Sequence, residues 1–133
     1  MCIRDSAYRE KIVTSELSYL GGEGNLLHPD VSALQRIQLK KTVLTEAQLA
    51  TIDVTRFKVT YLSTLYTDQL ENSLTDLGKQ AIKAVKNGAK ILVLDDKPLV
   101  NESGYAMPML LALSHIHQLL IREGLRMETS LVV

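Results

Sequence analysis

The sequence predicts an α/β fold: a βαβαβ unit with parallel strands, like part of a (β/α) barrel, preceded by an irregular N-terminal region. The first observation is the continuous apolar run at 90–94, because strands of a parallel sheet are covered on both faces. The second is that this run lies between two segments with helical periodicity and is followed by a last apolar run at 129–133. The connections after both helices are short, so right-handed crossovers are expected.

Length, composition and charge limit the function classes. A chain of 133 residues predicts one domain with a substantial core. Its 15 basic and 15 acidic side chains cancel, which argues against nucleic acid and anionic membranes as partners. No apolar run reaches the roughly 20 residues that a membrane helix requires. A single cysteine excludes an internal disulfide, and with no apolar signal core at the N-terminus it favours a cytoplasmic location.

The N-terminal region is expected to contain only short elements. Thr45 and Gln48 fit a capping box, in which each side chain accepts from the backbone amide of the other residue at the start of a helix. The elements expected before residue 57 are a helical start at 8–13, an extended segment at 17–20, a short strand at 36–39 and a short helix that continues to about Ile52.

Three glycines in four residues follow the extended segment, in Gly21-Gly22-Glu23-Gly24-Asn25. Glycine enters positive φ at low cost, so this composition predicts a turn. The functional alternative is a loop that binds phosphate. It lacks the G-x-G-x-x-G spacing and a following helix N-terminus, so the turn is the favoured interpretation.

The C-terminal half shows the clearest periodicity. A strand is expected at 57–62 because β-branched and aromatic residues are frequent there. Gly88 and Gly124 stand where C′ glycines end helices, and Pro108 fits the first turn of the second helix, which should continue to about Glu123. A final strand is expected from about 127 to 133. The first helix is marked by one apolar face: Leu70, Leu74, Leu77, Ala81, Ile82 and Val85.

Asp95-Asp96-Lys97 follows the strand at 90–94. Ligands of α/β sheets bind at the carboxyl ends of parallel strands, so the paired carboxylates could bind a cation or act as a base. Strands must also exit into polar turns, and no third oxygen ligand lies nearby in the sequence. The structural interpretation is therefore favoured over a ligand site.

Two histidines and two arginines near the second helix are candidate site residues. His115 and His117 are two positions apart and diverge by about 200° around a helix, so they cannot share one metal. His117 shares a face with leucines, which favours a core or interface histidine with a satisfied ring nitrogen over a metal ligand. Arg122 and Arg126 could contact an anion, but hydrogen bonds to the carbonyls at the helix C-terminus are favoured.

The C-terminal part of the chain and its first six residues both have unusual features. The second helix is apolar almost all round, which is typical of a helix buried in a larger protein, and the final apolar strand has no covering helix after it. We therefore expect an incomplete domain of low solubility. Residues 1–6 match the translation of a common sequencing-adaptor end, Met-Cys-Ile-Arg-Asp followed by Ser or Arg, and are expected to be non-native. Cys2, which could otherwise be an N-terminal nucleophile, would then have no role.

Taken together, several segments resemble the central domain of the glutamate synthase large subunit. That family typically contains G-A-x-I-L-V-L-S-D-R, then I-P-x-L-L-A-V-x-A-V-H-H-H-L-I-R-x-G-L-R, then S-L-V-V. The matching segments here are 19–27, 42–45, 88–96, 107–126 and 130–133. Departures include Asp95 for serine and His115 for alanine, and Gln118 and Leu119 stand in place of two histidines, so only His117 of the histidine cluster carries over.

The resemblance implies a parent enzyme that converts glutamine and 2-oxoglutarate into two glutamates. In that family an amidotransferase domain releases ammonia, which passes to a domain that holds FMN and an iron-sulfur cluster, and the central domain links the two. Residues 7–133 are accordingly expected to be an incomplete central domain, with the other two domains as partners. No catalytic, cofactor-binding or metal-binding residue is expected in it, and no activity alone.

Two alternatives stay open. One is a half barrel that binds a small molecule or phosphate at the Asp95-Asp96 strand end. The other is an independent interaction module that uses the apolar second helix as its partner surface.

Overall fold

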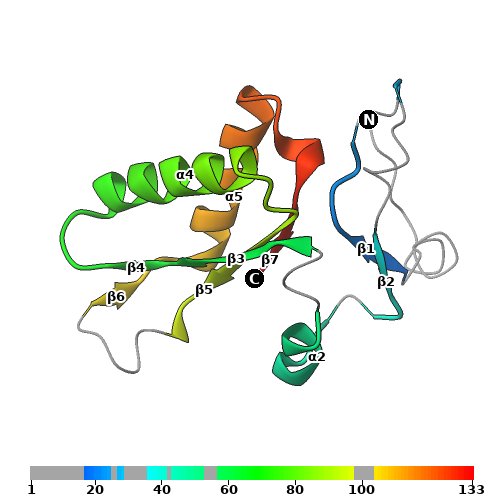
Figure 1. Ribbon diagram of the computed structural model, residues 1–133. Coiled ribbons are helices and arrows are strands. Elements are labelled where there is room, and N and C mark those ends of the chain that lie inside the picture. The colour runs from blue at the N-terminus through cyan, green and yellow to red at the C-terminus, as the bar shows by residue number, and fades with distance from the viewer. Residues whose placement is uncertain (1–16, 25–26, 29–35, 42, 53–56, 98–103) are drawn as a thin grey trace, which may run out of the picture.

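The core of the molecule is a small parallel sheet with helices on one face (Figure 1). This computed structural model describes residues 17–24, 27–28, 36–41, 43–52, 57–97 and 104–133. Two long helices lie side by side on one face of the sheet, and short N-terminal elements lie on the other. The helical start expected at 8–13 and the segment 1–6 with Cys2 lie outside the described residues.

The sheet has three parallel strands in the order β3-β5-β7. They are β3 (Val59–Ser63), β5 (Ile91–Asp95) and β7 (Ser130–Val132), aligned so that Leu92 lies opposite both Thr60 and Leu131. The central strand is apolar from Ile91 to Leu94 because its neighbours and both layers cover it. The parallel βαβαβ prediction is confirmed, and the sheet formed by the described residues is open, not a closed barrel.

The helical layer consists of α4 (Leu70–Lys86) and α5 (Met109–Arg122). Both helices end as their glycines predict. At the end of α4, Gly88 has φ 89°, its amide donates to Val85 O at 2.8 Å, and the Ala89 amide donates to Ala84 O at 3.0 Å, which is a Schellman motif. Gly124, with φ 68°, ends α5 in the same way. The core between helices and sheet contains Leu62, Leu77, Ala81, Val85, Leu92, Leu94, Ala112, Ile116 and Leu120.

The opposite face of the sheet is covered by the N-terminal elements. Strands β1 (Ser18–Leu20) and β2 (Ile37–Leu39) pair antiparallel, and helix α2 (Glu46–Ala50) lies beside them. The predicted capping box is confirmed, because the Thr45 amide donates to Gln48 Oε1 at 2.9 Å and the Gln48 amide donates to Thr45 Oγ1 at 3.3 Å. The buried cluster on this face is Leu20, Ile52, Phe57, Ile91 and Val93.

Three boundaries differ from the sequence predictions. The first sheet strand begins at Val59 instead of residue 57, because Lys58 adopts φ 45°, a left-handed conformation that a strand cannot contain. Pro108 is the N-cap of α5 and lies before its first turn. The last strand is shorter than expected, since residues 126–128 form a 3-10 turn, η3 (Arg126–Glu128), and only Ser130–Val132 pair with β5.

One small sheet was not predicted. Strands β4 (Leu65–Tyr66) and β6 (Tyr105–Ala106) pair antiparallel beyond the carboxyl end of β3. The rings of Tyr66 and Tyr105 lie 5.8 Å apart between centroids. Two-residue strands carry no detectable period, so their pairing depends on tertiary contacts.

Candidate functional site

The glycine-rich segment after β1 lies against the turn that precedes β7. The Gly21 amide donates to Ser130 Oγ at 3.0 Å, and the Ser130 hydroxyl lies 2.9 Å from Gly21 O. The amides of Glu23 and Gly24 both donate to Met127 O, at 2.6 and 3.2 Å. Three amides of the candidate phosphate loop are thus hydrogen-bonded within the chain, which favours the structural interpretation of this segment.

Close approach explains the middle glycine of this segment. A Cβ atom on Gly22 would lie 2.6 Å from the backbone oxygen of Glu128, closer than real Cβ atoms come to any atom. Gly22 therefore allows the N-terminal segment to lie directly on η3. The composition of the segment predicts a turn, but no feature of the sequence indicates this contact.

The strand end at Asp95–Lys97 forms a turn linked to α2. The Lys97 amide donates to Asp95 Oδ1 at 3.0 Å, and Lys97 Nζ lies 2.8 Å from Glu46 Oε1. Both partners of this ion pair are exposed. The hydrogen bond and the charge of Lys97 hold the pKa of Glu46 below its ordinary value, and the hydrogen bond to Glu46 raises the pKa of Lys97. These contacts agree with the structural interpretation of the segment.

The two histidines of α5 lie in different environments, as their spacing predicts. His115 is on the side that faces α4, where its Nε2 is buried without a hydrogen-bond partner among the described residues and would lie 3.0 Å from a Cβ on Gly78. His117 is on another side, and its Nδ1 accepts a hydrogen bond from Arg126 Nε at 2.9 Å. The prediction that a ring nitrogen of His117 is satisfied is confirmed. Within the described residues, no group of three or more His, Cys, Asp or Glu side chains could hold a metal ion.

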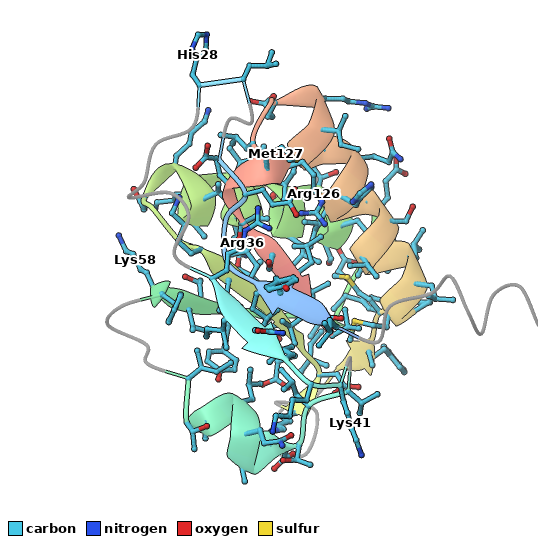
Figure 2. All side chains as sticks on the ribbon, turned by 90° about the vertical axis from the view of Figure 1, so that its right-hand side faces the viewer. His28, Arg36, Lys41, Lys58, Arg126 and Met127 are labelled. Carbon is cyan, nitrogen blue, oxygen red and sulfur yellow. The ribbon has the colours of Figure 1, made fainter. Side chains whose placement is uncertain are left out.

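The expected role of Arg126 was wrong. Its side chain does not bond to the carbonyls at the end of α5; Nε donates to His117 and Nη1 donates to Thr129 O at 2.8 Å. The reason is η3, which turns the chain back so that Arg126 lies alongside the helix (Figure 2). Arg122, on the last turn of α5, is exposed.

A groove of about 1140 Å³ lies along β7. Its walls come from β1, the start of α2, the carboxyl end of β5, the side of α5 that carries His117, and β7 itself. The lining is mixed: Leu131 and Val132 are apolar, while Arg126 and His117 lie in one part and Asp95, Asp96 and Lys97 in another. The structure therefore brings several sequence candidates to one groove, where Arg126, His117 and Lys97 each already have a partner within the chain.

The described part of the chain contains no helix that is long and apolar enough to cross a membrane.

Comparison with known proteins gives the family. The family model for the glutamate synthase central domain matches residues 5–133. The glutamate synthase [NADPH] large chain of Bacillus subtilis is 42% identical over 130 residues, which is 96% of this chain and 8% of the relative. Ferredoxin-dependent glutamate synthase 2 of Synechocystis sp. is 39% identical over 132 residues, and the chloroplastic ferredoxin-dependent enzyme of Spinacia oleracea is 35% identical over 133 residues, each covering 94% of this chain and 8% of the relative. The chain thus spans about 8% of the length of these relatives, and it belongs to the glutamate synthase central domain family.

Proposed function

We propose that this chain supplies the central-domain connector of a glutamate synthase large chain, which holds the ammonia-releasing domain and the FMN domain in a fixed arrangement. The observation that supports the proposal is the family match over residues 5–133 together with relatives that are about twelve times longer, as their 8% coverage implies. The parent reaction would convert glutamine, 2-oxoglutarate and a reductant into two glutamates.

The geometry supports a structural role because several of the polar groups that could serve chemistry make contacts that join distant segments of the chain. The amides of the glycine-rich segment bind Met127 and Ser130, Lys97 pairs with Glu46, and His117 accepts from Arg126. This network fixes segments relative to one another.

The residues of this chain do not fit the cofactors that the family implies. An iron-sulfur cluster requires several cysteine thiolates, and this chain has one cysteine. The glycine-rich segment is the place where an FMN phosphate would be sought, and the amides of Gly21, Glu23 and Gly24 in it are already bonded. We propose that FMN and the cluster bind elsewhere in the parent chain. A cytoplasmic location stays a prediction.

The connector role is tested in the full-length large chain recovered from the source genome. The variant Leu92→Ala removes a fully buried side chain from the central strand, and Lys79→Ala, on the outer face of α4, serves as the matched control. Three rates are measured: glutamine hydrolysis, glutamate synthesis from added ammonia, and glutamate synthesis from glutamine. Loosening the connector should leave the first two close to wild type and lower only the third, because ammonia transfer needs both sites held together.

Two results would contradict the proposal. If glutamine-dependent and ammonia-dependent synthesis fall by the same factor in Leu92→Ala, the domain contributes to the chemistry or to overall folding and not to coupling. If the purified 133-residue chain hydrolyses glutamine or supports FMN-dependent turnover, it carries an active site of its own.

A further inference from the structure

Arg126 carries a positive charge for which the described part of the chain provides no carboxylate. Its two hydrogen bonds go to neutral acceptors, His117 Nδ1 and Thr129 O. The nearby acidic groups are already used: Glu128 pairs with Lys90 at 3.0 Å, and Glu23 lies 3.7 Å from Arg36. Because a guanidinium has five N–H donors in a planar fork, Arg126 keeps donors for a further acceptor.

His117 carries a second donor beside Arg126. A ring nitrogen that accepts a hydrogen bond cannot carry a proton, so the bond from Arg126 puts the imidazole proton on Nε2. Both side chains are half-buried and line the groove along β7. Two bonds to neutral groups hold the guanidinium in one orientation, as a preformed anion receptor requires.

The strand beside this receptor has an open edge. In β7 the Ser130 amide donates to Lys90 O at 3.0 Å, toward β5. Successive backbone groups of a strand point to opposite sides, so the N–H and C=O of Leu131 point away from β5 into the groove. Among the described strands none pairs with β7 on that side. An edge of this kind is a template for another extended chain.

We propose that the groove receives an extended segment of the parent glutamate synthase chain outside residues 1–133, which pairs with β7 and places an acidic side chain on Arg126. The inference rests on the proposed function, which places most of the parent chain outside these residues. A chain segment can be distinguished from a free anion because the site has two requirements. A small carboxylate could pair with Arg126, but it cannot form the backbone hydrogen bonds of Leu131.

Hydrogen exchange shows directly whether the Leu131 amide at the edge of β7 is hydrogen-bonded. The exchange rate of the Leu131 amide is compared between the full-length large chain and the 133-residue chain, with the amide of Ala81 in α4 as internal reference. Pairing should slow exchange at Leu131 by at least about tenfold in the full-length chain and leave the ratio at Ala81 unchanged. Equal exchange at Leu131 in the two proteins would overturn the proposal.

The proposed contact between Arg126 and an acidic side chain is tested by removing the charge of Arg126. In the full-length chain, Arg126→Gln should raise the exchange rate at Leu131 by about tenfold, whereas Arg122→Gln, which removes an exposed arginine from the same end of α5, should leave it unchanged. Since Arg126 also holds His117 and Thr129, a second measurement uses the wild-type protein. Modification of Arg126 by phenylglyoxal should be at least about tenfold slower in the full-length chain than in the 133-residue chain, because a paired guanidinium is protected.

Two further outcomes would distinguish a free anion from a chain segment, and the docked segment from the connector role. If millimolar glutarate protects Arg126 in the 133-residue chain while Leu131 exchanges equally in both proteins, the receptor serves a free dicarboxylate and the proposal is wrong. If Leu131 is protected but coupling between the two half-reactions is unaffected by Leu92→Ala, the proposed connector role fails while the docked segment stands.

Discussion

The substitution Gly22→Ala tests whether the glycine-rich segment is a structural contact or a ligand loop. The added Cβ would lie 2.6 Å from Glu128 O, whereas ordinary contact begins at 3.4 Å, so the two segments must separate by about 0.8 Å. The obstacle is a backbone oxygen and cannot rotate away. Gly22 itself does not have positive φ, so backbone strain does not contribute to the effect.

The expected loss of stability follows from the contacts that are weakened when the Gly22 segment moves away from η3. Overpacking of this kind costs about 1–3 kcal/mol. The hydrogen bonds of Glu23 and Gly24 to Met127 O would lengthen, each with a net contribution of about 0.5–1.5 kcal/mol. We therefore expect Gly22→Ala to lower the free energy of unfolding by about 2–4 kcal/mol.

The matched control is Gly124→Ala. Gly124 has φ 68°, and no atom lies within 4 Å of the position that an added Cβ would take, so only left-handed strain of about 1–2 kcal/mol applies. Urea unfolding followed by circular dichroism gives both values, provided that the m-values agree. Amide exchange at Glu23 should also accelerate in Gly22→Ala. If Gly22→Ala costs no more than Gly124→Ala, close approach to η3 is not the reason for this glycine.

Three further substitutions, one of them with a matched control, test the core and the polar contacts. Leu120→Ala should cost about 2–5 kcal/mol in urea unfolding because the side chain is fully buried, while Leu110→Ala, 83% exposed, should stay within about 0.5 kcal/mol; equal effects would contradict the assigned faces of α5. His115→Leu should be neutral or stabilising, since it removes a buried nitrogen without a partner among the described residues, and a loss above about 2 kcal/mol would mean that Nε2 is bonded. Glu46→Gln should lower the Tm slightly between the two pKa values of its ion pair with Lys97. The lowered pKa of Glu46 makes its contribution fade as pH falls through the folded value, and the raised pKa of Lys97 makes it fade as pH rises, so a difference that grows at either extreme would refute this assignment.

Local patterns predicted the elements that local chemistry forms. The apolar run at 90–94, the stripe of α4, the capping box at Thr45 and the glycines after both helices each depend on neighbours within a few turns. The residues that cause each of these features are the same neighbouring residues from which the feature was predicted. That is why these predictions are confirmed with shifts of only one or two residues.

Contacts between distant segments could not be predicted in this way. Arg126 bonds to His117 across the glycine that ends α5, and no helical period relates residues on the two sides of such an end. The strands β4 and β6 are separated by α4 and β5, and each is too short to show alternation. The Gly22 contact to Glu128 requires knowledge of which surface the N-terminal segment covers. The family resemblance located these segments in order but did not say which of them touch.

The structure joins two segments of this chain that are far apart in the sequence. The segment that begins at Tyr19 and the segment that begins at Ser130 lie far apart in the chain, yet Gly21 and Ser130 exchange hydrogen bonds. The first segment thereby fixes the start of β7, while Arg126 fixes the turn before it through Thr129. Both constraints act on a strand whose outer edge no other described strand covers. The polar groups of these two segments therefore hold the start of β7 and the turn before it in place from both sides.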